Sequence, residues 1–438
     1  MTQAIDRREF LHQGAGGLAM AALAAPRVLA EDRPPVVVGL IGAGGMGTGH
    51  LGQLSKRSDV EIAWVCDVDA KRLQAGVELV AKNSGRTPRG TGDLRQVLAD
   101  GKVEAVWIAT PDHWHAPAAI LGLDAGKHVY VEKPCCHNLR EGQLLEAAVK
   151  RSGRRLQVGT QSRSSPTVRA GIERVLAGEI GEILVAKAWN SQLRGTIGKS
   201  APAAPPAGLD FDTWLGPTPV AEYRPNLLHG VWRWWHDYGC GDMGNDGVHD
   251  IDVAVWGLGV KTLPTRAACL GGKAFFDDDM QFPDTQYAVF EYPRADRPGV
   301  PKQLIFEQRI WSPYVQEGYE NGAAFYGTKG MLIIGHSVGW KLYGPRNKLI
   351  DEQQGRADIE PHHTNFLQAI RDPGVALNAD VQAGTLSAGL VHLGNIAARV
   401  QRTLQFDPET GDLVGDPQAA ELLGRKYRPG HWATPARS

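Results

Sequence analysis

The chain has 438 residues, more than a single hydrophobic core usually organises, so two domains are expected. Hydrophobic residues make up 42% and charged residues 22% of the sequence, which is typical of a globular protein. Because 47 basic residues are balanced by 48 acidic ones, the charge gives no reason to expect a nucleic acid or an anionic membrane as a partner.

The first thirty residues differ in character from the rest of the chain. Arg7 and Arg8 precede a small, weakly apolar segment from Gly14 to Ala25, and the small residue Ala30 closes a candidate cleavage site. This pattern resembles a twin-arginine export signal over residues 1–30, which predicts a periplasmic protein. The apolar stretch is short for a membrane span, so no stable membrane insertion is expected after cleavage. Retention of the signal as an anchor is the alternative.

A buried strand leads directly into a glycine-rich turn. Residues 36–41 form an apolar run without polar alternation, which is typical of a strand buried on both faces. In the G-x-G-x-x-G pattern that follows, the first glycine permits a tight turn and the second lets backbone N–H groups approach a pyrophosphate. The third lets the next helix press on the strand, and the helix N-terminus faces the anion. The residues expected to bind a dinucleotide here are Gly42, Gly44, Gly45, Met46 and Gly47.

The alternation of strands and helices continues to residue 160. A second apolar run, Val60 to Cys66, ends in Asp67, whose carboxylate would accept hydrogen bonds from ribose hydroxyls and would repel a 2′-phosphate. NAD is therefore expected rather than NADP. Further helices are predicted at residues 70–82, 93–99, 118–125 and 139–150, and strands at 103–109, 128–131 and 156–159. Residues 31–160 are predicted to form a doubly wound parallel α/β sheet, a Rossmann domain.

Two polar stretches follow strands of this sheet, at the carboxyl edge where open α/β sheets bind ligands. Pro111 stops the strand and lets a loop turn over the cofactor. The residues of these stretches expected at the cofactor are Thr110, Pro111, His113, His115, Glu132 and Lys133. The combination of a Rossmann half, T-P-x-x-x-H and E-K-P resembles the Gfo/Idh/MocA family of sugar oxidoreductases. The resemblance implies that Lys133 touches both the nicotinamide ribose and a substrate hydroxyl, and that Glu132 positions it.

Residues 161–438 are predicted to form a second, substrate-binding α/β domain. Strands are expected at residues 183–189, 265–270, 286–292, 303–311, 323–326 and 330–334, and helices at 167–177, 361–371 and 381–400. The last two helices are expected to pack back on the first domain. The resemblance implies a large open, mostly antiparallel sheet that covers the nicotinamide and joins subunits of a homo-oligomer.

The candidate chemistry of this half lies between Trp232 and Asp252. Asn245 and His249 are spaced i, i+4 and would share one face of a helix. The resemblance implies that His249 is the general base, oriented by an acid four residues earlier, but Asn245 stands at that position. Asp246, the next residue, would replace this missing acid only if the helix start is irregular. Further expected contacts are Gln161 to the cofactor, and Arg163, Trp234 and Asp246 to the substrate, with an indole face for a sugar ring.

These residues predict an enzyme that transfers a hydride between a carbohydrate or polyol carbon and a tightly bound NAD. His249 would move the hydroxyl proton, Lys133 would polarise the oxygen and Asn245 would orient His249. Two alternatives are an NAD-dependent glycoside hydrolase that oxidises, eliminates and re-reduces its substrate, and a non-catalytic sugar-binding protein. No metal is expected, since the side chains of three consecutive acids at 277–279 point in different directions.

Overall fold

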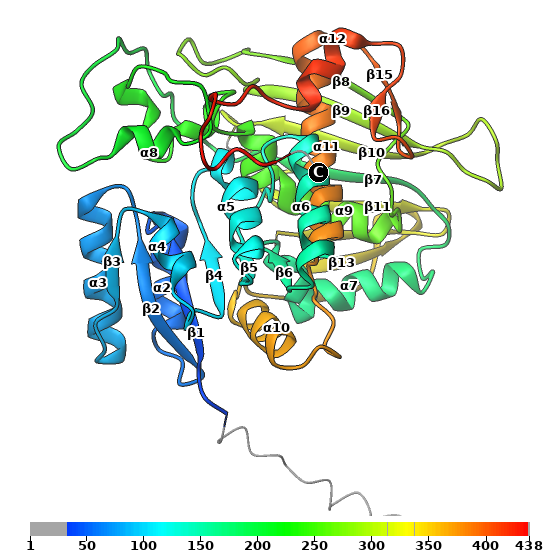
Figure 1. Cartoon of the computed structure of the whole chain (residues 1–438). Coiled ribbons are helices and arrows are strands. Elements are labelled where there is room, and N and C mark those ends of the chain that lie inside the picture. Colours follow the sequence, from blue (N-terminus) through cyan, green and yellow to red (C-terminus); the bar gives the residue numbers. More distant parts are fainter. Residues whose placement is uncertain (1–32, 313, 337, 437–438) are drawn as a thin grey trace, which may run out of the picture. The chain divides into compact units, whose positions relative to one another are not determined.

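Two β-sheets organise the protein (Figure 1). The computed structural model describes residues 33–312, 314–336 and 338–436, so the export signal predicted at residues 1–30 lies outside the described part. From Val36 onward the described chain forms one compact unit. The division expected at residue 160 therefore stays a prediction.

The first sheet is the parallel Rossmann sheet that the sequence predicts. Its strands, in spatial order, are β3 (Arg89–Thr91), β2 (Val60–Cys66), β1 (Val36–Ile41), β4 (Ala105–Ile108), β5 (His128–Val131) and β6 (Leu156–Val158). All neighbours in this order run parallel. β1 lies between β2 and β4, and this central position explains why its sequence is apolar without alternation.

The connecting helices have well-defined ends. They are α2 (Gly45–Leu54), α3 (Ala70–Ser84), α4 (Leu94–Ala99), α5 (Asp112–Asp124) and α6 (Leu139–Ser152). Asp69 caps α3 by accepting hydrogen bonds from the N–H groups of Lys71 and Arg72, and Gly85 ends it with a φ of 71°. α6 is built in the same way, with Asn138 as its N-cap and Gly153 at its end.

The second sheet is larger and mostly antiparallel, as predicted. In spatial order it contains β14 (Lys348–Gln354), β13 (Gly339–Gly344), β12 (Met331–Gly335), β11 (Asn321–Gly327), β7 (Ile183–Asn190), β10 (Lys302–Arg309), β9 (Thr285–Tyr292), β8 (Arg266–Gly272), β15 (Leu404–Asp407) and β16 (Asp412–Leu413). Only β7 and β10 pair in parallel among the strands of this sheet that the structure describes. The outer strands β13 to β16 and the short strand β3 were not predicted from the sequence.

Helices join the two sheets into one body. α7 (Pro166–Leu176), α9 (Val248–Leu258) and α11 (Val381–Val400) pack on the second sheet, and Figure 1 shows α11 beside α6 and α9. α11 contributes Ala388 to the core of the first sheet and Leu390 to that of the second. α10 (Glu360–Arg371) buries Phe366 in the core around β1. Both helices thus pack back on the first sheet, as predicted.

Two helix starts differ from the prediction. α5 begins at Asp112, so the stretch predicted as a loop over the cofactor is its first turn, because Pro111 presets the backbone dihedral and Asp112 favours a helix N-terminus. The predicted helix around Asn245 begins as a π-helical turn, Met243–Gly247, and becomes α-helical only at Val248. Such wider turns occur often at functional sites.

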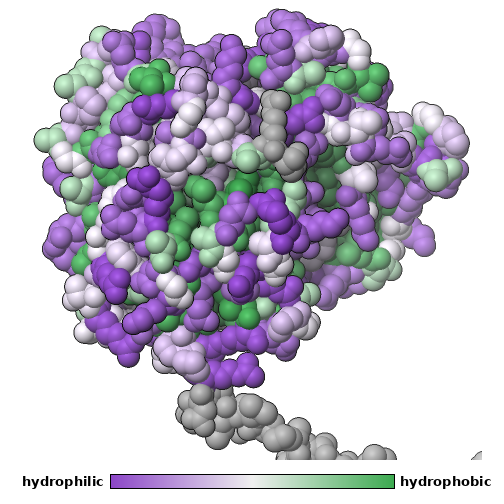
Figure 2. Space-filling view, in the orientation of Figure 1, coloured by the Kyte–Doolittle hydropathy of each residue, from purple (hydrophilic) through white to green (hydrophobic). Residues whose placement is uncertain are grey.

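Two segments outside these layers approach the first sheet. The insertion (residues 191–242) carries α8 (Phe211–Leu215), and its Gly208 carbonyl accepts a 2.9 Å hydrogen bond from the N–H of Ala70 at the start of α3. The C-terminal tail (residues 424–436) follows α12 (Pro417–Ala420) and runs beside α5, in red in Figure 1. Figure 2 shows hydrophilic residues on the projecting parts of this face and apolar residues in its recesses.

Within the described part of the chain, no helix has both the length and the hydropathy of a bilayer span.

Candidate functional site

The glycine loop after β1 has the geometry of a dinucleotide cradle. Gly42 adopts a φ of +93°, which side chains rarely allow. A Cβ on Gly47 would lie 1.8 Å from the carbonyl oxygen of Gly42, so only glycine lets α2 approach the loop this closely. The first amides of α2 receive no cap from any side chain that the structure describes, so they remain available to an anion. These features fit a pyrophosphate.

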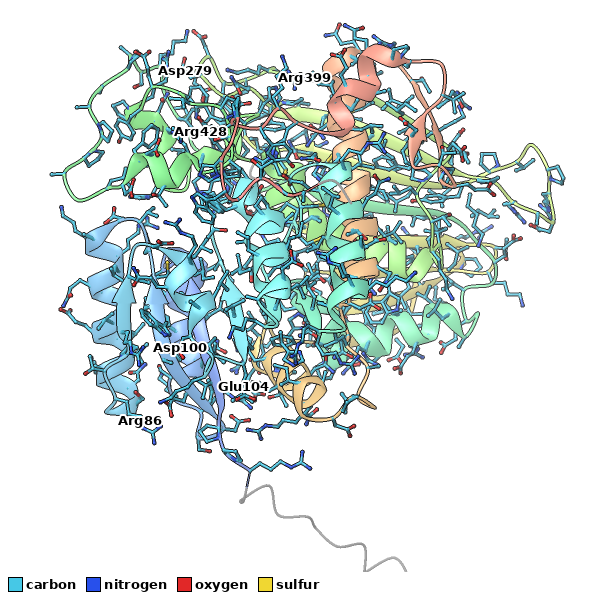
Figure 3. The ribbon with its side chains drawn as sticks, in the orientation of Figure 1. Arg86, Asp100, Glu104, Asp279, Arg399 and Arg428 are labelled. Carbon is cyan, nitrogen blue, oxygen red and sulfur yellow. The ribbon has the colours of Figure 1, made fainter. Side chains whose placement is uncertain are left out.

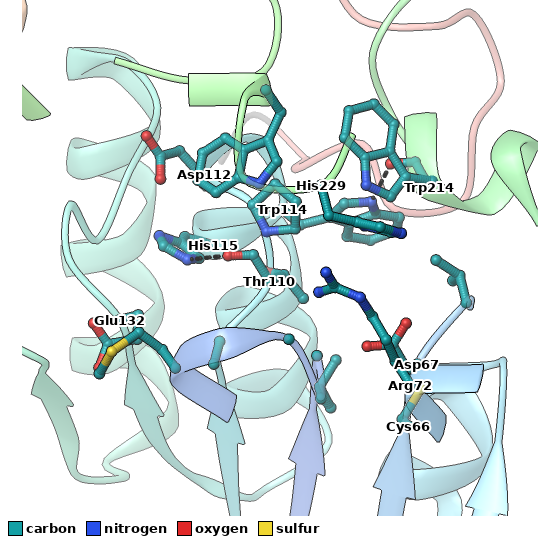
Figure 4. A pocket seen from close by; sticks show the side chains of 18 of the residues that line it. Cys66, Asp67, Arg72, Thr110, Asp112, Trp114, His115, Glu132, Trp214 and His229 are labelled. Carbon is teal, nitrogen blue, oxygen red and sulfur yellow. Dashed lines mark hydrogen bonds between the residues drawn. The ribbon is translucent and has the colours of Figure 1, made fainter. Parts of the chain in front are cut away.

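Asp67 closes the other side of this loop. Its Oδ2 accepts a 2.7 Å hydrogen bond from the N–H of Ala43, and its Oδ1 accepts one of 2.8 Å from Asp69. Burial raises the pKa of Asp67, while the two backbone N–H groups work in the opposite direction. Arg72 of α3 lies over the loop, since a Cβ on Gly44 would be 2.6 Å from its Nη1. Figure 4 shows Arg72 beside Asp67.

A cavity of about 420 Å³ runs along the carboxyl edge of the first sheet. It connects the glycine loop with Lys133 of the E-K-P stretch and with Asn245 of the second half. The predicted residues that line it are Gly42, Gly44, Gly45, Met46, Asp67, Thr110, Pro111, His115, Glu132, Lys133 and Asn245. The structure thus brings together most of the predicted cofactor residues.

His115 joins two of the loops at this edge. Its ring nitrogens lie 2.8 Å from the carbonyl oxygen of Thr110 and 2.7 Å from that of Pro134 (the first contact is dashed in Figure 4). Because Thr110 follows β4 and Pro134 follows β5, the imidazole fixes the spacing of the two strand ends. His115 therefore shapes the floor of the cavity.

Lys133 and Glu132 have separate partners. The Nζ of Lys133 donates a 2.5 Å hydrogen bond to the carbonyl oxygen of Asn245, which draws the two halves of the chain together. The Oε1 of Glu132 lies 3.0 Å from Nε2 of His50, whose Nδ1 lies 2.8 Å from Nε2 of His363. Burial opposes ionisation of Glu132, but the His50 hydrogen bond and the Lys133 charge outweigh it and lower the pKa of the carboxyl.

His249 lies at the start of α9 and is only 4% exposed. Its Nδ1 is buried without a hydrogen-bond partner among the described residues. Burial lowers the pKa of His249 well below its ordinary value, and the charges of Lys133 and His336 lower it further. The His336 ring lies 5.0 Å away, edge to face, and its Nδ1 is 3.1 Å from Asp250. A neutral His249 can accept a proton.

The predicted pairing of Asn245 with His249 is wrong. The Nδ2 of Asn245 donates a 2.8 Å hydrogen bond to Asp242 instead, because the π-helical turn breaks the i, i+4 alignment that a regular helix would give. Asp246 forms an ion pair with Arg194. Burial opposes ionisation of the Asp246 carboxyl, but the charges of Lys133, Arg194 and His336 outweigh burial and lower its pKa.

Two residues predicted to contact the cofactor lie elsewhere. His113 is buried with its Nε2 2.8 Å from the carbonyl oxygen of Trp214, where it joins α5 to the insertion. Burial lowers the pKa of His113 to about 3, and the charge of Arg425 acts in the same direction. Gln161 lies in the 3-10 turn after β6, outside the cavity lining, and its Oε1 is buried without a partner in the part of the chain that the structure describes.

Two residues predicted to contact the substrate do not line the cavity either. Arg163 makes two hydrogen bonds of 2.7 and 2.9 Å to the buried carboxylate of Asp252, so its charge is used within the fold. Trp234 is 4% exposed and packs against Met280 and Ile310. Trp232, two residues earlier in the same 3-10 turn, lines the cavity in its place.

Several residues that line the cavity were not predicted. They include Arg72, Asp112, Trp114, Trp214, His229, Trp232, Arg233 and Trp432. Figure 4 shows Trp114 and Trp214 above the strand ends, with His229 between them and Arg72. Asp112 is buried at the start of α5, and burial raises its pKa against the charges of His115 and Lys133. The tryptophans on either side of Arg233 indicated a ligand-binding site, but the sequence did not show which of them lines the cavity.

The three acids at 277–279 accept hydrogen bonds from other side chains of the fold. Asp278 accepts hydrogen bonds from Thr196 and Lys273, and Asp279 accepts one from Asn226. Over residues 33–312, 314–336 and 338–436, no group of three or more His, Cys, Asp or Glu side chains is arranged to hold a metal ion.

Parts of the sequence are similar to curated proteins. Levoglucosan dehydrogenase of Pseudarthrobacter phenanthrenivorans is 30% identical over 227 residues, which are 51% of this chain and 51% of that protein. A glycosyl hydrolase family 109 protein of Shewanella sp. strain W3-18-1 is 33% identical over 126 residues, 28% of each chain. The matches span about half or less of the length of these relatives.

The solved structures support the fold. The aldose-aldose oxidoreductase from Caulobacter crescentus, solved with glycerol, has a TM-score of 0.64 at 15% identity and covers 85% of this chain and 100% of its own. Residues 36–160 match an oxidoreductase family described by its NAD-binding Rossmann fold, and residues 183–267 and 340–434 match the C-terminal alpha/beta domain of such a family. Because these matches span more than half of the chain, the protein belongs to the Gfo/Idh/MocA family of oxidoreductases, and its first sheet is the family's NAD-binding Rossmann fold.

Proposed function

We propose that the protein transfers a hydride between a carbohydrate or polyol carbon and a tightly held NAD. The observation that carries this proposal is one cavity that joins the glycine loop and Asp67 to Lys133 and Asn245. His249 lies outside the lining of this cavity, but close enough to Lys133 for that charge to lower its pKa. When bound, the nicotinamide ring accepts or returns the hydride. The similarity to levoglucosan dehydrogenase supports a sugar-like substrate.

The chain's own residues divide the remaining work. Backbone amides of the glycine loop and of α2 would hold the pyrophosphate, and Asp67 would accept hydrogen bonds from the adenosine ribose. Lys133 would donate to the substrate hydroxyl oxygen and stabilise negative charge there. His249 would take or return the hydroxyl proton, because burial and the charge of Lys133 lower its pKa and favour the neutral imidazole. Asn245 would place Lys133 through its carbonyl oxygen.

The first test is to identify the nucleotide and the substrate together. The purified full chain is denatured and any released nucleotide is identified by mass. The native protein is then offered sugars, polyols and glycosides while reduced nicotinamide is followed by absorbance. Release of NAD and its reduction by a sugar or polyol would support the proposal. A chain that binds no nicotinamide nucleotide would refute it.

A histidine variant tests the role of the base. His249→Gln is expected to bind NAD as the parent does but to lose at least about 100-fold in kcat, the usual contribution of general base catalysis. His128→Gln is the matched control, since His128 lies at the amino end of β5, away from the carboxyl edge. Parent-like turnover by His249→Gln would show that another group moves the proton.

Glycosidic cleavage is a second candidate, favoured by the similarity to the glycosyl hydrolase family 109 protein. Transient oxidation, elimination of the aglycone, addition of water to the resulting double bond and re-reduction would restore NAD within each cycle. Cleavage products that accumulate without added NAD would favour this reaction, whereas continuous reduction of added NAD would favour a plain dehydrogenase. Sugar binding without turnover would favour a binding protein.

The cellular setting is part of the proposal. The Arg7-Arg8 pattern supports export by the twin-arginine route to the periplasm, and the family resemblance supports a homo-oligomer. Cell fractionation tests the first, and the mass of the purified protein in solution tests the second. Retention of the chain in the cytoplasm of a cell with an active twin-arginine system would refute export.

A further inference from the structure

The C-terminal tail is fixed to the protein on both sides of Trp432. Before it, Arg425 forms an ion pair with the fully buried Glu141 of α6, with a nitrogen–oxygen distance of 2.7 Å. Arg428 then pairs with Asp212 of α8 at 2.7 Å, and Figure 3 shows Arg428 close to the insertion. After it, Ala433 is 2% exposed and belongs to the core of the first sheet. The indole is thus held in one place.

Trp432 faces the cavity at the end nearest to β3. The centroid of its ring lies 5.8 Å from that of Trp114. The guanidinium of Arg95, a residue of α4, lies 4.6 Å from the centroid of the Trp432 ring. Leu94, at the start of the same helix, also lines the cavity. Trp432 remains 39% exposed, so part of its surface is open to a ligand.

The order of the strands tells which part of the dinucleotide would lie there. Lys133, at the nicotinamide end, follows β5, the glycine loop follows β1, and Asp67, at the adenosine ribose, follows β2. A dinucleotide that crosses this edge in that order brings its adenine toward β3. The adenine would therefore meet the Trp432 end of the cavity.

We propose that Trp432 is a cofactor-binding residue whose indole stacks on the adenine, so that the C-terminal tail closes the cavity over that end of NAD. This inference rests on the proposed function. A purine plane against an indole is favourable because both are flat and polarisable, and Arg95 on the indole adds a cation–π contact that orients it.

The insertion borders the same cavity. His229 of the insertion lies 3.1 Å from Asp69 at the start of α3, and both His229 and Trp214 line the cavity or its rim. The Arg428–Asp212 ion pair ties the insertion to the tail. On this proposal, release of the nucleotide requires movement of one of these two segments, which would slow its dissociation and favour a cofactor that stays bound through repeated turnovers.

Two variants of the full chain separate stacking from simple burial. Trp432→Leu keeps an apolar side chain and removes the aromatic plane, whereas Trp432→Phe keeps a plane. Dissociation constants are measured for NADH, for AMP and for nicotinamide mononucleotide after bound nucleotide has been removed. Leu270→Ala, on an exposed position of the second sheet, is the control, and melting temperatures without nucleotide check that each variant is folded.

Trp432→Leu is expected to weaken NADH and AMP by about 10-fold each, with nicotinamide mononucleotide unchanged and NADH dissociation faster. Trp432→Phe should lie close to the parent. Parent-like affinity of Trp432→Leu for AMP would overturn the inference and leave the proposed function standing. A parent that binds no NADH overturns both. A parent that binds NADH, weakened in Trp432→Leu, but that turns over no substrate would retain the inference and refute the oxidoreductase.

Discussion

Replacing Gly47 by alanine tests whether the loop after β1 is a working dinucleotide site. The new Cβ would lie 1.8 Å from the carbonyl oxygen of Gly42, whereas such contacts are essentially never shorter than 3.0 Å. The start of α2 must therefore move about 1.2 Å away from the loop, the difference between these distances. Gly49→Ala is a matched control on the same helix, because nothing lies within 4 Å of its added Cβ.

The displacement has two measurable consequences. Overpacking of this kind costs about 1–3 kcal/mol of stability. A movement of this size also breaks hydrogen bonds between the α2 amides and a pyrophosphate, and since bonds to charged groups contribute about 1.5–3 kcal/mol each, losing two weakens NAD at least about 100-fold. Gly49→Ala should be neutral or stabilising by up to about 1 kcal/mol, because alanine favours a helix more than glycine does.

Isothermal titration with NAD and urea unfolding measure these effects on the same samples. The expected result is a folded Gly47→Ala protein with weak NAD binding and a Gly49→Ala protein that matches its parent in affinity. If Gly47→Ala bound NAD with the parent's affinity, the close contact between α2 and the loop would not be the basis of the site.

Two further predictions concern buried charges. Burial opposes the charged form of His336, but Asp250 raises its pKa, and positive charge on His336 helps burial to depress the pKa of His249. His336→Gln should therefore move the acid limb of the kcat/KM profile to higher pH, and an unmoved or lowered limb would contradict this. Arg425→Met leaves the carboxylate of Glu141 buried without its cation and should cost about 3–5 kcal/mol in urea unfolding; a loss below about 1 kcal/mol would refute the importance of the pair. Adding Glu141→Leu should recover only part of this cost, because the N–H of His137 and the hydroxyl of Tyr427 also donate to Glu141.

Much of the first sheet follows from local sequence. The strand Val60–Cys66 and the helix Val381–Val400 have the predicted bounds, because unbroken apolar runs and long periodic stretches are strong signals. β14 gives no such signal, since its residues 348–354 are all exposed and it forms by pairing with β13 at the sheet edge. Its strand character depends on a neighbour rather than on its own pattern.

By itself the sequence determined the parallel sheet, the glycine loop, Asp67 and the position of Lys133 at the end of a strand, because each depends on residues close together in the chain. Only the tertiary structure decided which side chains reach the cavity. The π-helical turn removed the expected link from Asn245 to His249, and an ion pair with Asp252 withdrew Arg163. Trp432 reaches the cavity through contacts of the tail with Glu141 and Asp212, whose long separation in the chain no local pattern records.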